Sequence, residues 1–550
     1  MLPREHGDGA VTERQADAAP DQTAALVRRF IKPGLIGATA MALGAYGAGW
    51  VSQASGIGDW PILQTFRSTP ALTFVARVLV FLGVAILLQA WLRLGHYVRT
   101  HHVADGAALS RLVWWWGAPL LAAPVLFSRD VYSYIAQSRL MPHGVNPYVY
   151  GTGVYDTFFT DGADAMWKHA PAPYGPLWMG LSSLVYEATG GRAIPALILF
   201  RLLAFAGVVL LVIFVPRLAK ACGADPAKAI WLGLLNPLLF MHFVSGAHND
   251  ALMLGLLVAG ITLTLERRPI LGIVLIAAAG AVKAPALVGL AFAPLVWAGP
   301  GASWWRRIKL WGVALGIAAV VFLGLNLVTG LDFGWLSALE TPGKVHTWLS
   351  PSTAFGMITG DVMNLFGLGS NVDSAINAWR LVGTVLDAAV LLYLVLTGQR
   401  RSPVRGLGLA LLAVVALGPV VQPWYVLWAL VLLASAGLSA RGTRLAVLFC
   451  TGLVLYSIAG SGATIPTYLF VSEGVATLVS LAIVALMLTW SSRARAVLLE
   501  DTIVPEPDDL VLTGGRVPTA SRGSVGTGVA TLVTDAAAPV AAVESPPGVA

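Results

Sequence analysis

The segment Ser128-Arg-Asp-Val-Tyr-Ser-Tyr134 opens the first long polar break in a chain that is otherwise almost entirely apolar, and Ala172-Pro-Tyr-Gly-Pro176 closes it. Asp130 stands at the end of one hydrophobic run, and apolar sequence resumes after the break. Because runs of about 17–25 apolar residues recur through the chain, it is predicted to be an all-α integral membrane protein. We interpret the polar break as a reactive face that the helices hold at one bilayer surface.

Composition supports a membrane protein. The chain has 550 residues, of which 57% are hydrophobic and 11% are charged, whereas a soluble domain has roughly 25% charged residues. The formal net charge of +7 resides mostly in short loops between apolar runs. Such loops set membrane orientation, so no nucleic-acid partner is expected. Cys222 lies in a basic loop and Cys450 in an apolar run, and no disulfide is expected between them.

The basic loops also decide the predicted topology. They all fall in the cytoplasm only if residues 176–189 lie on the outer surface as an interfacial amphipathic helix. About 14 spans then place both termini in the cytoplasm and the reactive face on the extracytoplasmic side of the plasma membrane. The predicted spans cover residues 34–52, 71–95, 112–127, 194–216, 229–246, 250–265, 268–281, 285–298, 309–329, 376–397, 406–420, 424–438, 444–459 and 466–490.

The chain is predicted to have three parts. Residues 1–33 are polar and Ala-rich and are expected to be a disordered cytoplasmic segment. Residues 34–490 form the transmembrane domain, with large outer loops at 128–193 and 330–375. Residues 491–550 are expected to be a disordered cytoplasmic tail. No internal repeat is visible, which disfavours the inverted-repeat architecture of many transporters.

Asp130 is the leading candidate for catalysis. A carboxylate at a membrane surface can act as general base on a hydroxyl group. The position equally suits a helix cap, in which Ser128 or Asp130 caps a short surface helix over residues 131–141. Tyr134 and Gln137 share a helix face with Asp130, and that polar stripe suits either a sugar or water.

Three further acids follow in the same loop, namely Asp156, Asp161 and Asp164. Carboxylate oxygens are what Mg²⁺ or Ca²⁺ need, but this spacing matches no known metal loop. A divalent metal is therefore not favoured, and no cofactor is expected. Tyr174 lies in a Pro-rich entry to the interfacial helix, where aromatic residues suit the headgroup level with or without sugar contact.

Two more polar sites lie at predicted outer turns. The turn His248-Asn249-Asp250 returns directly into an apolar run, and ionisable groups at such a depth are functional hypotheses by default. Asn249 or Asp250 could instead cap the following helix. Lys283 breaks the orientation bias, so its partner is either an anionic lipid phosphate or the interface reached by snorkelling.

The remaining candidates are single residues. Asn236-Pro237 lies inside a predicted span and should kink it. Lys344 in the second outer loop and Trp424 in the turn Gln422-Pro-Trp-Tyr425 could line a lipid or sugar groove.

Several motifs together carry a resemblance that none carries alone. They resemble the polyprenol-phosphomannose-dependent α-1,6-mannosyltransferases of actinobacteria, which are C-type (GT-C) glycosyltransferases that extend the mannan backbone of lipomannan and lipoarabinomannan. The resemblance covers about residues 34–490. The motifs are Ser128-Arg-Asp-Val-Tyr-Ser-Tyr134, Gln137, Asn146-Pro-Tyr148, Ala172-Pro-Tyr-Gly-Pro176, Leu235-Asn-Pro-Leu238, His248-Asn-Asp250 and Ala281-Val-Lys283.

This resemblance implies a GT-C fold with paired surface helices in the first outer loop and Asp130 as catalytic base. The implied reaction is an inverting transfer of mannose from polyprenyl-phosphate mannose to a 6-hydroxyl of a lipid-anchored α-1,6-mannan. Lys283, with Arg129 or Lys344 in reserve, is expected to stabilise the leaving phosphate. Sugar contacts are expected from Tyr134, Gln137, Tyr174, His248, Asn249, Asp250 and Trp424.

Two alternatives stay open. A GT-C transferase that uses another polyprenyl-phosphate sugar, such as glucose or arabinose, would need the same residue types. A transporter or flippase for a lipid-linked sugar would also place polar groups at the membrane edge. It should in addition show polar residues at mid-bilayer depth and pseudo-symmetric halves, and the sequence shows neither clearly.

Overall fold

A computed structural model describes residues 8–503 apart from 53–54, 102, 104, 156–161, 370, 399–401 and 460–472. Within these residues the secondary structure is helical, and the only extended pairing is the isolated bridge between Trp50 and Val125. The longer helices are α1 (Asp8–Ala48), α3 (Pro70–Thr100), α7 (Ala193–Ala221), α12 (Trp304–Thr329), α15 (Val372–Thr397), α18 (Ala440–Ala459) and α19 (Glu473–Trp490).

Shorter elements complete the bundle. The helices are α2 (Pro61–Ser68), α4 (Arg111–Leu121), α5 (Asp130–Ser138), α6 (Pro176–Thr189), α8 (Pro226–Ala229), α9 (Asp250–Leu265), α10 (Pro269–Val282), α11 (Gly289–Ala298), α13 (Trp335–Ala338), α14 (Pro351–Leu365), α16 (Pro403–Leu417), α17 (Val426–Ser435) and α20 (Ser492–Leu499). Two π-helical turns, η7 (Ile230–Leu234) and η8 (Leu239–Ser245), interrupt the α-helical pattern. The 3-10 turns are η2 (Ile57–Asp59), η3 (Gly106–Ser110), η4 (Met141–His143), η5 (Thr152–Val154), η6 (Ala165–Lys168), η9 (Ala284–Val288), η10 (Thr341–Lys344) and η11 (Pro423–Tyr425).

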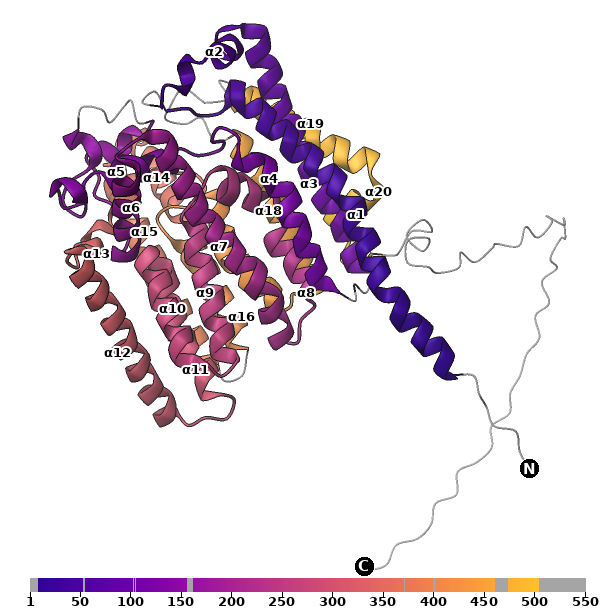
Figure 1. Ribbon diagram of the computed structural model, residues 1–550. Helices are drawn as coiled ribbons and strands as arrows, with labels where there is room; N and C mark the ends of the chain where they lie inside the picture. Colours follow the sequence, from indigo (N-terminus) through magenta and orange to yellow (C-terminus); the bar gives the residue numbers. More distant parts are fainter. Residues whose placement is uncertain are drawn as a thin grey trace, which may run out of the picture.

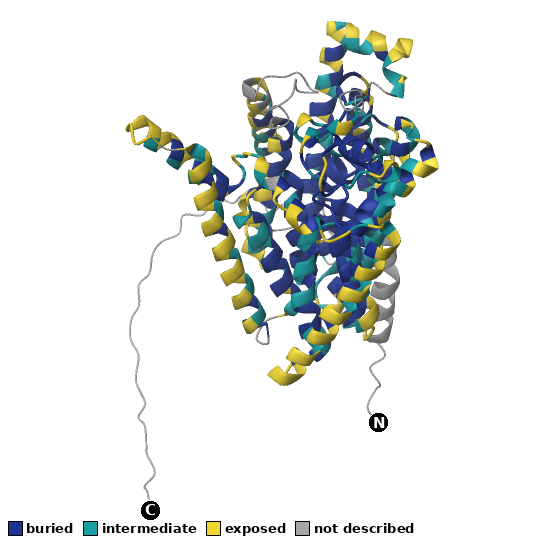
Figure 2. Ribbon diagram, turned by 90° about the vertical axis from the view of Figure 1, so that its left-hand side faces the viewer, coloured by how far each residue is buried: buried dark blue, intermediate teal, exposed yellow. Residues whose placement is uncertain are grey.

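Figure 1 shows the long helices running roughly side by side, with α2, α5, α6 and α14 toward one end of the bundle. Figure 2 shows exposed residues along the outer faces of the helices and buried residues through the centre. Large apolar side chains are exposed on these outer faces, including Leu327 at 83% and Val328 at 86% on α12. Faces of this kind suit lipid rather than water, in keeping with an integral membrane protein.

Helix length limits the number of membrane crossings that the described residues support. Among the described residues, five helices are long and apolar enough to span a bilayer, or up to seven if each bent pair counts as one span. Other apolar helices are short: α9 has 16 residues and is therefore about 24 Å long, against a hydrocarbon core of about 30 Å. The count of about 14 spans thus stays a prediction.

Several boundaries agree with the sequence. The interfacial helix predicted over 176–189 corresponds to α6, and the span predicted over 250–265 corresponds to α9. The predicted kink at Asn236-Pro237 is confirmed, because the helical pieces on its two sides meet at 64°. Asn236 stabilises the break by accepting a hydrogen bond from the Leu238 N–H.

Other boundaries differ. The span predicted over 112–127 ends at Leu121, since Pro124 follows and the chain then pairs through Val125 with Trp50. Helix α1 begins at Asp8 and so includes much of the segment expected to be disordered. Helix α20 occupies the start of the predicted tail, whose residues from 504 onward lie outside the described part of the chain.

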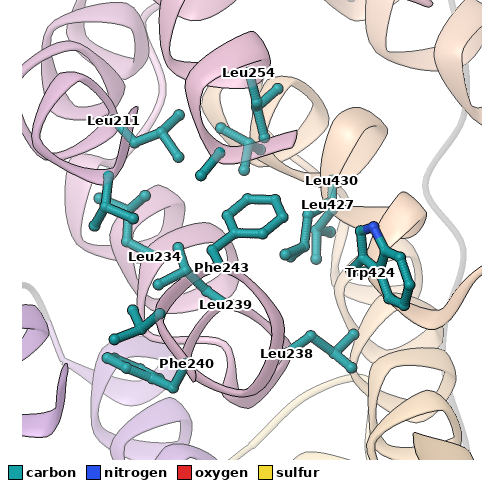
Figure 3. Packing of buried hydrophobic residues seen from close by; sticks show 14 of the residues in the cluster. Leu211, Leu234, Leu238, Leu239, Phe240, Phe243, Leu254, Trp424, Leu427 and Leu430 are labelled. Carbon is teal, nitrogen blue, oxygen red and sulfur yellow. The ribbon is translucent and has the colours of Figure 1, made fainter. Parts of the chain in front are cut away.

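A buried apolar cluster supports the polar turns at one end of the bundle. Figure 3 shows leucine and phenylalanine side chains from η7, η8, α7, α9 and α17 packed around Phe243, with Trp424 at the edge of the cluster. Phe243 is 1% exposed, and Leu427 is fully buried. This apolar layer supports the turn that carries His248 and the turn that carries Trp424.

Candidate active site

A cavity of about 400 Å³ opens beside Asp130 at the polar end of the bundle. Four parts of the chain form its wall: the segment predicted as the first outer loop, the break between α10 and η9, the segment predicted as the second outer loop, and the stretch from the end of α16 to the start of α17. Its lining residues are Asp130, Met166, Trp167, Pro173, Tyr174, Lys283, Ala284, Pro285, Leu339, Val345, Val414, Val415, Gly418, Pro419, Val420, Gln422, Trp424, Tyr425 and Trp428.

Asp130 is the first residue of α5, and its side chain is 30% exposed. The helix has no side-chain cap, so the capping interpretation of Asp130 is wrong. The Ser128 hydroxyl instead accepts a hydrogen bond from the Asp130 N–H at 3.1 Å, which fixes the start of the helix. The carboxylate is thus free of a capping role and lines the cavity.

His248 lies behind the Asp130 carboxylate. Its Nδ1 atom is 3.3 Å from Asp130 Oδ2, and the imidazole is fully buried. The ring stacks on the indole of Trp424, with 3.9 Å between ring centroids. Because Trp424 lines the cavity and His248 does not, the histidine supports Asp130 from the protein side.

The protein environment keeps Asp130 ionised. Burial by itself raises the pKa of this carboxyl group, because a charge loses solvation in an apolar setting. The adjacent His248 ring, the charge of Lys283 and the Ser128 hydroxyl outweigh burial, so that the pKa lies below its usual value. A negative charge is therefore present at neutral pH, as a proton acceptor requires.

Lys283 makes an ion pair with a buried acid. Its Nζ atom lies 2.9 Å from both carboxylate oxygens of Asp250, whose side chain is fully buried. Trp424 Nε1 donates to Asp250 Oδ2 at 3.2 Å, and Trp428 Nε1 donates to Asp250 Oδ1 at 2.8 Å. Lys283 lines the cavity as well, so its positive charge can act on a ligand there.

Aromatic rings also surround the Lys283 ammonium group. Nζ lies 5.0 Å from the centroid of Tyr425 and 5.5 Å from that of Trp428. Cation–π contacts of this kind hold an ammonium group in place. Lys283 is the only cation among the described residues that line the cavity.

Unusual backbone conformations precede both polar segments. Phe127, just before Ser128, has φ 63°, and Ala247, just before His248, has φ 52°. Non-glycine residues rarely adopt positive φ, and such positions often occur at functional sites. These two residues turn the chain so that Asp130 and His248 meet.

A glycine brings the first loop against α10. A Cβ atom at Gly175 would lie 2.4 Å from the Ala281 carbonyl oxygen, so only glycine allows this approach. The contact places Tyr174 and Lys283 on the same cavity. Burial raises the pKa of Tyr174 well above its ordinary value, so its phenol stays protonated and can donate a hydrogen bond.

The polar stripe on α5 faces the protein interior rather than water. Tyr134 is fully buried, and its hydroxyl donates to Asn249 Oδ1 at 3.3 Å. Gln137 is 1% exposed. Neither residue lines the cavity, and neither does Asn249. These three predicted sugar-binding residues therefore lie behind the cavity wall, and Asp250 is occupied by Lys283.

The two reserve cations lie elsewhere. The Arg129 guanidinium donates to the carbonyls of Gly162 at 2.8 Å and Ala163 at 2.6 Å, and it stacks over Trp50. Lys344 is exposed at the end of η10 and does not line the cavity. A role for either cation at the leaving phosphate lacks support from the geometry.

The possible metal-binding acids are only partly visible. Asp156 and Asp161 lie outside the described residues. Asp164 accepts a hydrogen bond from the Met166 N–H at 2.9 Å and caps η6. The expectation that no metal is needed stays a prediction.

Sequence reasoning missed Trp428 and the apolar wall. Trp428 lies one helical turn after Trp424, so an i, i+4 pattern of tryptophans could have found it. The apolar wall comes from the end of α16, with Val414 and Val415, and from the connection that follows it, with Val420. Nothing in the sequence pattern of an apolar helix separates cavity-lining valines from core valines.

Helix α14 fixes the rim of this wall. The Ser350 hydroxyl donates to the Gly418 carbonyl at 2.8 Å, and the Thr353 hydroxyl donates to the Pro419 carbonyl at 2.6 Å. Arg380 on α15 donates in turn to the Thr353 hydroxyl at 2.9 Å. The second outer loop thus shapes the cavity through the backbone that it holds.

Comparison with known proteins shows that the chain is similar in sequence to a family of mannosyltransferases. The family described as "Alpha-(1->6)-mannopyranosyltransferase, N-terminal domain" matches residues 31–299, and the MptB C-terminal domain matches residues 352–494. A probable alpha-(1->6)-mannopyranosyltransferase of Mycolicibacterium smegmatis is 35% identical over 494 residues, which cover 82% of this chain and 86% of the relative.

Two further relatives have the same character. An alpha-(1->6)-mannopyranosyltransferase of Mycobacterium tuberculosis is 33% identical, over 82% of this chain and 85% of its own length. Alpha-(1->6)-mannopyranosyltransferase B of Corynebacterium glutamicum is 28% identical, over 85% of this chain and 82% of its own length. No solved structure matches the chain significantly.

Proposed function

The chain belongs to the alpha-(1->6)-mannopyranosyltransferase family, and on that premise we propose that it transfers mannose from polyprenyl-phosphate mannose to the 6-hydroxyl of a lipid-anchored α-1,6-mannan. The reaction inverts the configuration at the donor sugar and takes place at the outer face of the plasma membrane. The observation that carries this proposal is a single cavity lined by the Asp130 carboxylate, the Lys283 ammonium group and an apolar wall.

The cavity suits the two chemical halves of such a donor. The end of α16 and the connection after it contribute Val414, Val415 and Val420, which can contact the first isoprene units. Lys283 can bring its positive charge to the phosphate, because it lines the same cavity. Trp424 and Tyr425 offer ring faces and edges to the sugar between them.

Asp130 is the proposed general base. As the acceptor 6-oxygen attacks C1 of mannose, Asp130 takes its proton, and the C1–O bond to phosphate breaks on the opposite side. The bonding electron pair leaves with polyprenyl phosphate, so a β-linked donor gives an α-linked product. Because a phosphate is already a good leaving group, positive charge from Lys283 takes the place of a general acid. Base assistance of this kind contributes about 10²–10⁴-fold.

The surrounding residues have positioning roles in this proposal. His248 and Asn249 were expected to contact the sugar, but both are fully buried, and His248 touches Asp130. We assign His248 to orienting the base and Asn249 to holding Tyr134 through its amide oxygen. Tyr174 and Trp424 remain as candidate sugar contacts because both line the cavity.

The proposal extends to architecture and orientation. It assumes a GT-C fold with α5 and α6 as the surface helices of the first outer loop, and both termini in the cytoplasm. A surface position for α6 (Pro176–Thr189) keeps the basic loops on the cytoplasmic side of the membrane. This distribution of charge supports an extracytoplasmic site.

The first test is transfer by membranes that contain the wild-type chain or the Asp130→Asn variant. Membranes receive radiolabelled polyprenyl-phosphate mannose and a short α-1,6-mannoside acceptor. The wild type should extend the acceptor, and the asparagine variant should lose about 10²-fold or more of the rate while retaining its expression level. Glu187→Gln, which changes an exposed acid on α6 that does not line the cavity, serves as the matched control.

Two outcomes would count against the proposal. Transfer from polyprenyl-phosphate glucose or arabinose, but not mannose, would reassign the donor. Wild-type rates from Asp130→Asn would remove the base from the mechanism and leave the family relationship intact.

A further inference from the structure

A second cavity, separate from the one beside Asp130, lies where α1, α2 and α3 meet. It has a volume of about 480 Å³, and its wall includes Trp50, Arg67, Ser68, Thr73 and Arg77. It adjoins the catalytic loop, because Trp50 pairs with Val125 and its carbonyl accepts a hydrogen bond from Tyr132 at 2.9 Å. We call it the arginine pocket.

The arginine pocket is held open by backbone contacts. Arg67 donates from Nε to the Tyr46 carbonyl at 3.1 Å and from a terminal nitrogen to the Gly49 carbonyl at 2.6 Å. These bonds fix the guanidinium and use two of its five N–H groups. Since carbonyls carry no net charge, Arg67 brings its full positive charge to the pocket.

The location of these arginines is unusual for a membrane protein. In the predicted topology the end of α1 and the start of α3 lie outside, where Lys and Arg are disfavoured. Arg67 and Arg77 therefore run against the orientation bias, as Lys283 does at the first cavity. The partners of Arg67 are neutral backbone carbonyls, so an anionic group in the pocket would balance its positive charge.

The surroundings of the pocket are apolar and exposed. Trp60, directly before α2, is 58% exposed, and Ile62 on α2 is 71% exposed, as expected for a short helix at the headgroup level. On α3, Phe74, Val78 and Leu82 are 64%, 43% and 50% exposed. They recur every four residues, so they form one stripe on α3, next to the face whose residues Thr73 and Arg77 line the pocket.

We propose that the arginine pocket binds the phosphate of an anionic phospholipid in the outer leaflet. Arg67 and Arg77 contact the phosphate oxygens, and the hydroxyl of Ser68 contacts the headgroup. One acyl chain lies along the stripe of Phe74, Val78 and Leu82. A phosphate-bearing headgroup attached to an acyl chain matches both the charge and the apolar continuation of the pocket.

The test measures which lipid stays with the purified full-length protein. The protein is equilibrated in mixed micelles of phosphatidylglycerol and phosphatidylcholine, and native mass spectrometry then counts the retained lipids. The wild type should retain phosphatidylglycerol in preference. Arg77→Gln and Arg67→Gln should each reduce this preference about fivefold, the effect of one cation near a lipid surface.

Matched variants distinguish lipid binding in the arginine pocket from an effect of the net charge of the protein. Arg192→Gln removes an exposed arginine at the start of α7, away from the pocket, and should retain the preference. Arg77→Lys should restore most of it, because the charge remains. Phe74→Ser should weaken retention of the lipid without abolishing binding of inorganic phosphate.

Three results would overturn the inference. The first is equal retention of phosphatidylglycerol by the wild type and Arg77→Gln. The second is equal loss in Arg192→Gln and the pocket variants. The third is complete displacement of the lipid by millimolar inorganic phosphate, which would identify a soluble phosphate as the ligand.

Discussion

Asp250 receives hydrogen bonds from three side chains on two different segments, Lys283 from the α10 end and Trp424 and Trp428 from the α17 region. A buried carboxylate with this many donors is stable only while its partners remain. The same ion pair places the ammonium group that we assign to the donor phosphate. Structural and functional roles therefore coincide at Lys283, and a single substitution does not separate them.

A pair of substitutions does separate these roles. Lys283→Met should lose transfer and also lose stability, by about 3–5 kcal/mol, because it leaves Asp250 charged and buried. The double variant Lys283→Met/Asp250→Asn should recover most of the stability, since the remaining amide is neutral, but not the transfer. Thermal unfolding in detergent and the mannose-transfer assay measure the two effects. A double variant with wild-type transfer would show that the phosphate does not need Lys283.

The pH dependence of transfer tests the contact between His248 and Asp130. The carboxylate must be ionised to accept a proton, so transfer should persist above its lowered pKa and decline as the pH falls through it. Replacement of His248 by Phe removes a contact that lowers this pKa and leaves burial, which raises it. The decline in rate should therefore begin at a higher pH in His248→Phe.

The control for that experiment is His242→Phe. His242 belongs to the same ring cluster, 5.8 Å from His248 between centroids, but its Nε2 atom contacts the Ser457 hydroxyl rather than Asp130. In this variant the transfer rate should decline at the same low pH as in the wild type. If the rate of His248→Phe also declined at the wild-type pH, the role of His248 in positioning Asp130 would be contradicted.

Whether a site residue can be predicted from the sequence depends on whether its role comes from its place in the chain or from a contact with a distant segment. Asp130 was accessible to sequence reasoning because it ends an apolar run at a predicted surface. The pairing of Asp250 with Lys283 was not, because the two residues are 33 positions apart and lie on different helices. The burial of Tyr134 and Gln137 was also missed, since a polar helix face predicts water unless its neighbours α6 and α7 are known.

At the scale of elements, the first turn of α9 depends on close packing against α7. A Cβ atom at Gly207 would lie 2.2 Å from the Ala251 carbonyl, directly after Asp250. The approach of the two backbones thus positions the acid that holds Lys283. Periodicity predicts both helices well, but it does not predict which glycine forms their contact.

Gly207→Ala should therefore disturb the site from a distance. The added methyl group must displace α9, at a cost of about 1–3 kcal/mol, and transfer should fall with stability. Gly312→Ala on α12 is the matched control, because its Cβ would meet no atom within 4 Å. Glycine disfavours helices, so this control should unfold at the same or a higher temperature. Wild-type stability and rate in Gly207→Ala would show that the helices can separate freely.

Short elements were the least predictable from sequence. Helices α2 and α14 lie in segments interpreted as loops, and both begin with proline at the first turn, a common helix start. Their apolar residues are too few to register as spans. Helices α6 and α9 were predicted with their boundaries because long apolar runs end there at polar or glycine residues.

At the scale of the whole molecule, the orientation in the membrane rests on the distribution of basic loops. Val149, exposed in the first outer loop, should face the cell exterior, and Ala221, exposed at the end of α7, should face the cytoplasm. In a Cys222→Ser background, Cys450 is buried and should stay silent toward a membrane-impermeant thiol reagent. Val149→Cys should react in intact cells, whereas Ala221→Cys should react only after the membrane is opened. The reverse pattern would place the cavity on the cytoplasmic side.

The ion pair between Lys283 and Asp250 has a consequence for turnover. In the proposed reaction the incoming donor is a phosphodiester with one negative charge, and the departing carrier is a monoester with about −1.5 to −2 at pH 7. An ammonium group without an acidic partner would bind that departing carrier more strongly than the incoming donor. Because Asp250 neutralises part of the charge of Lys283, the protein attracts the departing polyprenyl phosphate less strongly. The polyprenyl phosphate can then diffuse back into the bilayer before the next cycle.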